Sequence, residues 1–146
     1  MIRLAYISKQ TVPLSTDEIK RILQQSIRNN ASKSITGMLL FYNGTFLQIL
    51  EGNEKSIKDL YEALELDSRH KDLAVVYKKE IDDPSFTSWS MGFVDVEEIL
   101  NKGDKDFVHL FNEAFNKNAE NTEIVKDKIN TIMEKFQHGA WRTFIH

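Results

Sequence analysis

The chain has 146 residues and a net charge of −3, with 41% hydrophobic and 28% charged residues. This composition is typical of one globular domain in water, and the negative charge argues against a nucleic-acid partner. Cysteine is absent, which excludes disulfides, thiol catalysis and cysteine-ligated metal sites. No apolar run approaches the roughly 20 residues of a membrane span, and the chain opens on a strand-like run rather than a signal peptide. We therefore expect a cytoplasmic protein without a membrane partner.

The first predicted elements are a strand and a helix. Alternating side chains predict a strand over Ile2–Ser8, which ends at the turn Thr11–Pro13. Ser15 and Glu18 fit a capping box, in which each side chain satisfies an orphan amide at a helix start. We expect this helix to end near Asn29–Asn30, because asparagine is a poor helix former.

A β-hairpin is predicted over Ile35–Gly52. Its turn is Asn43–Gly44, since both residues tolerate the positive φ of a type I′ turn. Gln48 lies in the second strand, and the two-residue period of a strand places it on the same face as Phe46 and Leu50. A buried amide without a hydrogen-bond partner costs about 1–3 kcal/mol. The partner of Gln48 is therefore the main question that this stretch raises.

Three more elements complete the sheet. Apolar spacing predicts a second helix over Glu54–Asp67, and strands are expected over Leu73–Ile81 and Trp89–Val94. The order β-α-β-β-α-β plus a fifth strand predicts an α+β, ferredoxin-like fold. In this fold a mostly antiparallel sheet carries two helices on one face.

The remaining residues form a tail after Gly103. Asp104–Lys117 and Thr122–Gln137 are predicted as two amphipathic helices. Such helices do not fold alone, so we expect them to cap a sheet face, another subunit or both.

Several kinds of active site are not indicated. Neither a glycine-rich phosphate loop nor a G-x-S-x-G nucleophile elbow occurs, and the four histidines are scattered. Tyr6, Ser26, Asn30 and Gln48 instead point to one groove between the two predicted helices. Asn and Gln each offer a donor and an acceptor, which suits a flat ligand with alternating polar groups. The alternatives are a core tyrosine bonded to the backbone and an asparagine that only terminates its helix.

Six short motifs, in this order and spacing, resemble BLUF domains, which are blue-light sensors that use FAD. They are L-x-Y-x-S around Tyr6, Asn29–Asn30, I-T-G at Ile35–Gly37, F-L-Q-I-L-E-G at Phe46–Gly52, D-x-R-H at Asp67–His70 and W-S-M at Trp89–Met91. The resemblance implies a flavin-binding domain over residues 1–95 and a C-terminal helical extension over residues 96–146.

The resemblance also implies that FAD lies non-covalently between the two helices. Ile22 and Leu64 would press on the two faces of its ring, and many family members carry isoleucine at the second position. Asn30 would bond the pyrimidine edge, while Arg69 and His70 would lie near the ring edge or the ribityl and phosphate part. The implied cofactor-binding residues are Tyr6, Ile22, Ser26, Asn29, Asn30, Gln48, Leu64, Asp67, Arg69 and His70.

Tyr6 and Gln48 would then be the photoactive pair. By this resemblance, light drives an electron and a proton from Tyr6 to the flavin, and Gln48 is left rotated or tautomerised. Ser26 would accept a hydrogen bond from Gln48, or donate one to it, in one of the two states. Either Trp89 or Met91 would lie near Gln48 and swing as the signal passes to the tail. Ordinary core packing is the alternative for these last two residues.

The implied function is a non-catalytic photosensor that signals to a partner protein or through its own homo-oligomer, held by the C-terminal helices. Two other functions stay open. One is a BLUF-like interaction module without flavin, and the other is a ferredoxin-like enzyme acting on a small acyl or phosphate substrate.

Overall fold

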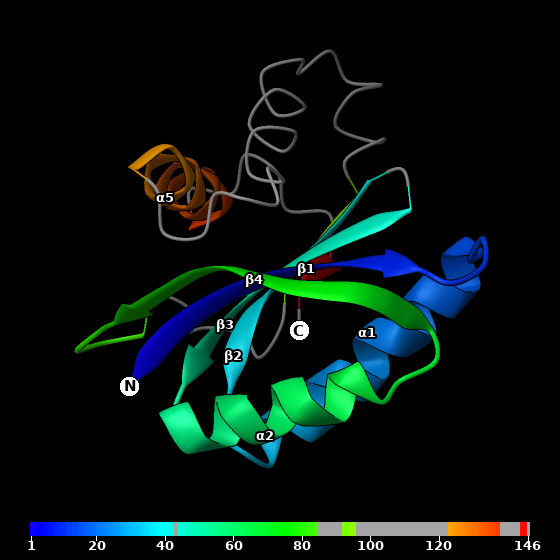
Figure 1. Ribbon diagram of the computed structural model, residues 1–146, viewed down its shortest axis with the longest axis horizontal. Coiled ribbons are helices and arrows are strands. Elements are labelled where there is room, and N and C mark those ends of the chain that lie inside the picture. Colours follow the sequence, from blue (N-terminus) through cyan, green and yellow to red (C-terminus); the bar gives the residue numbers. More distant parts are fainter. Residues whose placement is uncertain (43, 85–91, 96–122, 138–143, 146) are drawn as a thin grey trace.

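A computed structural model describes residues 1–42, 44–84, 92–95, 123–137 and 144–145 (Figure 1). Its elements in chain order are β1 (Ile2–Gln10), α1 (Thr16–Ala31), β2 (Thr36–Tyr42), β3 (Thr45–Gly52), α2 (Glu54–Glu65), β4 (His70–Glu80), β5 (Gly92–Asp95), α5 (Glu123–Gln137) and β6 (Phe144–Ile145). The predicted β-α-β-β-α-β order with a fifth strand is confirmed. The predicted helix over Asp104–Lys117, together with Trp89 and Met91, lies outside the described residues.

The strands form one sheet in the order β4-β1-β3-β2-β5-β6. Neighbouring strands are antiparallel except for β2 and β5, which are parallel. The first four strands therefore have the ferredoxin-like arrangement, as predicted.

Both strands at one edge of the sheet extend further than the sequence indicated. β1 continues to Gln10 and β4 begins at His70, and these two residues are paired. Between the pairs Lys9–Lys71 and Ile7–Ala74, two residues of β4, Asp72 and Leu73, stand opposite one of β1, and Asp72 has a φ of +55°. The prediction of Leu73 as the first residue was wrong because this bulge lets a polar segment join the sheet.

The helix ends are set by side-chain caps and main-chain hydrogen bonds. Ser15 forms the predicted capping box, since its hydroxyl accepts from the Glu18 amide at 3.2 Å. α1 runs on to Ala31, and the Asn30 carbonyl then accepts from the Ile35 amide at 2.9 Å. α2 ends at Glu65, two residues before the predicted end, because the following amides bond three residues back and tighten the last turn.

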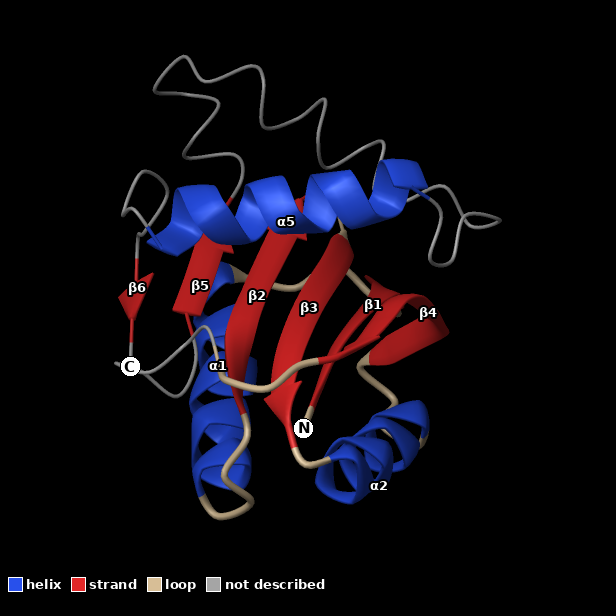
Figure 2. Cartoon of the chain, turned by 90° about the vertical axis from the view of Figure 1, so that its left-hand side faces the viewer, coloured by secondary structure: helices blue, strands red, loops and turns tan. Residues whose placement is uncertain are grey.

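Helices cover both faces of the sheet. Figure 1 shows α1 and α2 on one face and α5 on the other, and Figure 2 shows α5 lying across the strands. Ile129, Ile132 and Met133 of α5 are buried, which confirms the predicted cap for this second helix of the tail. Within the described part of the chain, no helix combines the length and the apolar character needed to cross a membrane.

Candidate functional site

A cavity of about 200 Å³ lies between α1 and α2, above the sheet. Its walls come from the two helices, its floor from β1, β2 and β3, and one end from the α2–β4 loop. The lining residues are Tyr6, Ile22, Gln25, Ser26, Asn29, Leu39, Gln48, Leu60, Ala63, Leu64, Asp67, Arg69 and His70. All the residues predicted to bind a cofactor, except Asn30, therefore come together around one cavity.

Tyr6 and Gln48 form the floor of the cavity. They are directly opposite each other on the antiparallel strands β1 and β3, so their side chains leave the same face of the sheet. The Tyr6 hydroxyl donates a hydrogen bond to Oε1 of Gln48. Both side chains are buried, with 2% and 4% of their surface exposed. The strand period predicted that Gln48 faces the core, and its burial confirms this prediction.

The Tyr6 phenol is held in its neutral form. Burial raises its pKa far above the ordinary value, and electrostatic repulsion from the nearby Tyr61 and Asp67 adds to this effect. The ring of Tyr61 also packs edge-on against Tyr6, with 5.6 Å between the ring centroids. Tyr6 is therefore a hydrogen-bond donor and does not lose its proton as a simple acid.

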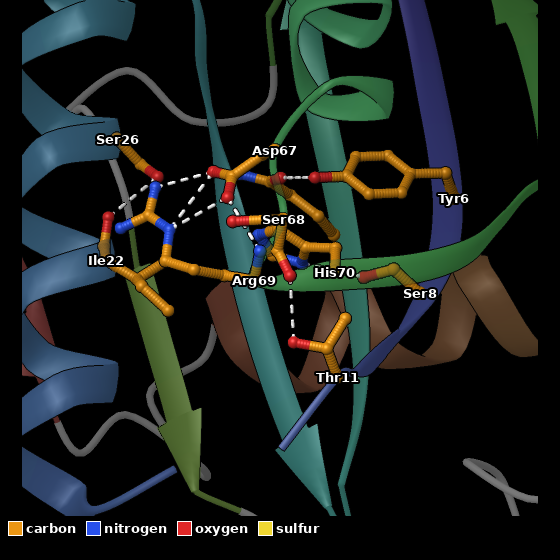
Figure 3. Close-up of polar contacts among 10 residues, drawn as sticks. Tyr6, Ser8, Thr11, Ile22, Ser26, Asp67, Ser68, Arg69 and His70 are labelled. Carbon is orange, nitrogen blue, oxygen red and sulfur yellow. Dashed lines mark hydrogen bonds and ion pairs between the residues drawn. The ribbon is translucent and has the colours of Figure 1, made fainter. Parts of the chain in front are cut away.

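One face of α1 forms a wall of the cavity. Ile22, Ser26 and Asn29 recur at helical spacing and all line it. The Ser26 hydroxyl donates to the Ile22 carbonyl at 2.9 Å (Figure 3). Its only proton is used within the helix, so towards a ligand it presents its oxygen as an acceptor.

Asn30 follows Ser26 by one helical turn and is 1% exposed. Neither its side-chain nitrogen nor its side-chain oxygen has a hydrogen-bond partner. Among the described residues, the Tyr77 hydroxyl is the one other buried side-chain polar group without a partner. The helix end uses the Asn30 carbonyl instead of its side chain, so helix termination does not explain the amide. A buried donor and acceptor without partners fit a ligand with a complementary polar edge.

The α2–β4 loop closes one end of the cavity. Asp67 accepts from Nη2 of Arg69 at 2.6 Å and from its Nε at 3.0 Å, and its Oδ1 also accepts from the Arg69 amide at 2.9 Å. These hydrogen bonds hold the pKa of Asp67 below its usual value. Figure 3 shows the Arg69 guanidinium extended towards α1. Asp67 thus fixes Arg69 as part of the wall.

His70 is set back behind this loop. Its Nδ1 lies 3.2 Å from the Ser8 hydroxyl, and its ring packs on Phe46 with 5.2 Å between centroids. Burial lowers the pKa of His70, so the imidazole is neutral at pH 7. It lines the cavity as a polar but uncharged group.

Sequence reasoning did not include four of the lining residues, namely Gln25, Leu39, Leu60 and Ala63. Leu39 stands directly opposite Gln48 on β2, and the other three lie within one turn of a predicted residue on α1 or α2. Strand register and helix spacing would have found them once Gln48, Ile22 and Leu64 were chosen. Trp89 and Met91 are outside the described residues.

Comparison with known proteins identifies the family. A sequence model of the BLUF family, sensors of blue light using FAD, matches residues 1–92. The chain is also 32% identical over 117 residues to photoactivated adenylate cyclase subunit beta from Euglena longa. That alignment covers 73% of this chain and 14% of the relative, so the chain spans a small part of the relative's length.

Solved structures give the same result for the fold. A bacterial light-regulated adenylyl cyclase matches with a TM-score of 0.69 and 30% identity, over 95% of this chain and 40% of that one. The BLUF protein BlrB in its dark state matches with a TM-score of 0.77, over 94% of this chain and 96% of that one. Its identity of 22% supports the shared fold alone.

Proposed function

The chain belongs to the BLUF family of blue-light sensors, and we propose that it binds FAD in the cavity between α1 and α2 and switches by rearranging the Tyr6–Gln48 hydrogen bond. The observation that carries this proposal is the buried pair on the cavity floor, with Tyr6 donating to Gln48. A phenol and an amide at the base of a ligand cavity are suited to moving a proton and reversing a hydrogen bond.

The residues of the cavity fit a flavin. Ile22 and Leu64 line it from the two helices and would enclose the ring between apolar surfaces. The unpartnered amide of Asn30 would bond the polar pyrimidine edge, where donors and acceptors alternate. When bound, the flavin supplies absorption of blue light and an acceptor for an electron.

Tyr6 is the proposed donor of the electron and the proton. Its raised pKa keeps the proton on the phenol in darkness, so proton release follows removal of an electron. Gln48 accepts the Tyr6 hydrogen bond through Oε1. A rotated or tautomerised Gln48 would present the opposite polarity to Tyr6 and to the ligand.

The energy of this rearrangement is enough for a switch. Each buried hydrogen bond that is remade or lost changes the free energy by about 1–3 kcal/mol. A difference of this size shifts a two-state equilibrium about 5- to 150-fold. No covalent bond to the cofactor is needed, which agrees with a chain that has no cysteine.

The sheet offers a route for the signal. Gln48 faces the cavity, whereas its neighbours Leu47 and Ile49 in β3 are fully buried and point to the opposite face, which α5 covers (Figure 2). A shift of β3 would therefore reach α5. We propose that residues 96–146 pass the signal to a partner protein or through a homo-oligomer, and that the chain itself is a sensor and not an enzyme.

Flavin binding tests the site with a matched pair of variants. Leu64→Glu places a carboxylate on the cavity wall, whereas Leu66→Glu makes the same change on a side chain that is 88% exposed. Fluorescence titration with FAD should give tight binding to the wild type and to Leu66→Glu, and at least tenfold weaker binding to Leu64→Glu. Failure of the wild type to bind FAD, or equal binding by both variants, would refute the proposed site. The first of these results would favour the flavin-free interaction module.

A further inference from the structure

Ser8, the last residue of the L-x-Y-x-S motif, is a buried polar residue that the proposed switch does not use. It is 1% exposed, and the other buried polar or charged side chains among described residues are Asn30, Gln48 and Glu51. The first two belong to the site, and Glu51 forms an ion pair. Within the described part of the chain, the Ser8 hydroxyl makes one hydrogen-bond contact, with Nδ1 of His70 at 3.2 Å. The role of Ser8 is therefore tied to His70.

The register of β1 and β4 brings Ser8 and His70 together. His70 stands opposite Gln10, two residues along β1 from Ser8, so both side chains leave the cavity face of the sheet, as Tyr6 does. The bulge at Asp72–Leu73 lies directly across from Ser8, and such bulges redirect the side chains beside them. Figure 3 shows Ser8 next to His70. The fold thus gives the imidazole a fixed partner on the sheet.

This contact decides which ring nitrogen of His70 carries the proton. A serine hydroxyl has one proton, and among described residues no acceptor other than Nδ1 is bonded to it. Leaving a buried donor without an acceptor is costly. The hydroxyl therefore donates to Nδ1, and the neutral ring carries its own proton on Nε2. Burial lowers the pKa of His70, so the neutral ring is the form present at pH 7.

Nε2 is the polar ring atom of His70 that remains for a ligand. It has no hydrogen-bond partner in the part of the chain that the structure describes, and it is not sealed in the core. The His70 side chain lines the cavity. With its proton, Nε2 is a donor there, whereas in the opposite tautomer the same atom would repel an oxygen of the ligand.

We propose that Ser8 is a positioning residue that holds His70 in its Nε2–H tautomer, so that the ring donates a hydrogen bond to an oxygen of the ligand. The ligand part of this inference rests on the proposed function. In a flavin, the accepting oxygen belongs to a ring carbonyl or to a hydroxyl of the ribityl chain. Ser8 does not line the cavity, so it acts through His70.

Nitrogen NMR spectra of the flavin-free protein test the tautomer. At about pH 8, where the ring is neutral, they distinguish the bare ring nitrogen from the protonated one, and His70→Gln identifies the His70 signals. The wild type and Ser8→Thr, which keeps the hydroxyl, should carry the proton on Nε2. Ser8→Ala should shift the tautomer ratio towards Nδ1–H roughly twofold to twelvefold, the range for one neutral hydrogen bond.

Thr11→Ala is the matched control for these spectra. The Thr11 hydroxyl donates to the Ser68 carbonyl at 2.8 Å, so this variant also removes a hydroxyl contact to the α2–β4 loop but leaves the His70 contact in place (Figure 3). Its His70 signals should match those of the wild type. A wild-type proton on Nδ1, or a Ser8→Ala tautomer ratio equal to that of the wild type, would overturn the inference.

Titration with riboflavin and with lumiflavin, which has a methyl group in place of the ribityl chain, tests the ligand part. Ser8→Ala should bind riboflavin roughly twofold to twelvefold more weakly than the wild type, Ser8→Thr and Thr11→Ala do. An equal loss with lumiflavin would place the acceptor on the ring, and a loss with riboflavin alone would place it on the ribityl chain. No loss with either flavin would overturn the ligand part. A wild type that binds neither flavin would overturn the proposed function, while the spectra would still decide the role of Ser8.

Discussion

Replacing Asn30 by leucine should change the stability of the flavin-free protein and its affinity for FAD in opposite ways. Asn30 is 1% exposed, and both polar atoms of its side chain lack a partner. An unmade buried hydrogen bond costs about 1–3 kcal/mol. Leucine has a similar size and no polar group, so the free energy of unfolding of the flavin-free variant should rise by about 1–3 kcal/mol.

The same substitution removes the two hydrogen bonds that Asn30 would make to FAD. Each of these hydrogen bonds contributes about 0.5–1.5 kcal/mol. Loss of both should therefore weaken FAD binding roughly 5- to 150-fold. Urea unfolding without flavin and fluorescence titration with FAD measure the two effects. Leucine also favours a helix by a few tenths of a kcal/mol, and Asn130→Leu on α5, at an exposed position, measures that contribution separately.

Two results would refute this reasoning about Asn30. If Asn30→Leu destabilises the flavin-free protein, the amide has a structural role in the fold. If the variant binds FAD as tightly as the wild type, the side chain does not meet the ligand.

Three further predictions concern the cavity. Tyr6→Phe should keep bound flavin but lose the light-induced spectral shift. The control Tyr61→Phe, which removes the hydroxyl of the neighbouring ring, should keep both the flavin and the shift. A normal shift in Tyr6→Phe would remove this residue from the mechanism. Gln48→Leu should also bind flavin without responding to light, and a retained photocycle in this variant would contradict the switch. Because the pKa of His70 is lower in the folded state, the contribution of His70 to stability is fully present above the unfolded pKa of about 6.5. This contribution is lost as the pH falls from there through the lower folded pKa. Urea unfolding should therefore show less pH dependence between pH 7 and 5 in His70→Gln, and an unchanged slope would show that His70 is not responsible.

The sequence predicted the parts of the site that follow from periodic patterns. The two-residue period of β3 places Gln48 among core residues, and the helical period of α1 aligns Ile22 with Ser26. These features depend on local spacing, which the chain keeps when it folds. Tyr6 on the first strand was predicted to line the same groove, and the register of β1 and β3 sets it opposite Gln48.

Features that depend on tertiary packing were not predicted. The polar segment at the start of β4 gave no strand signal, and it joins the sheet only because β1 is there to pair with it. Arg69 was predicted at the cofactor from the motif resemblance alone, and its place in the wall depends on its hydrogen bonds to Asp67.

The absorption spectrum of the FAD-bound protein, recorded in darkness and after a blue flash, is the decisive measurement of the proposed light response. We expect a flavin band that moves slightly to the red after the flash and returns in darkness. A flavin band that stays unchanged by light would contradict the proposed switch between Tyr6 and Gln48.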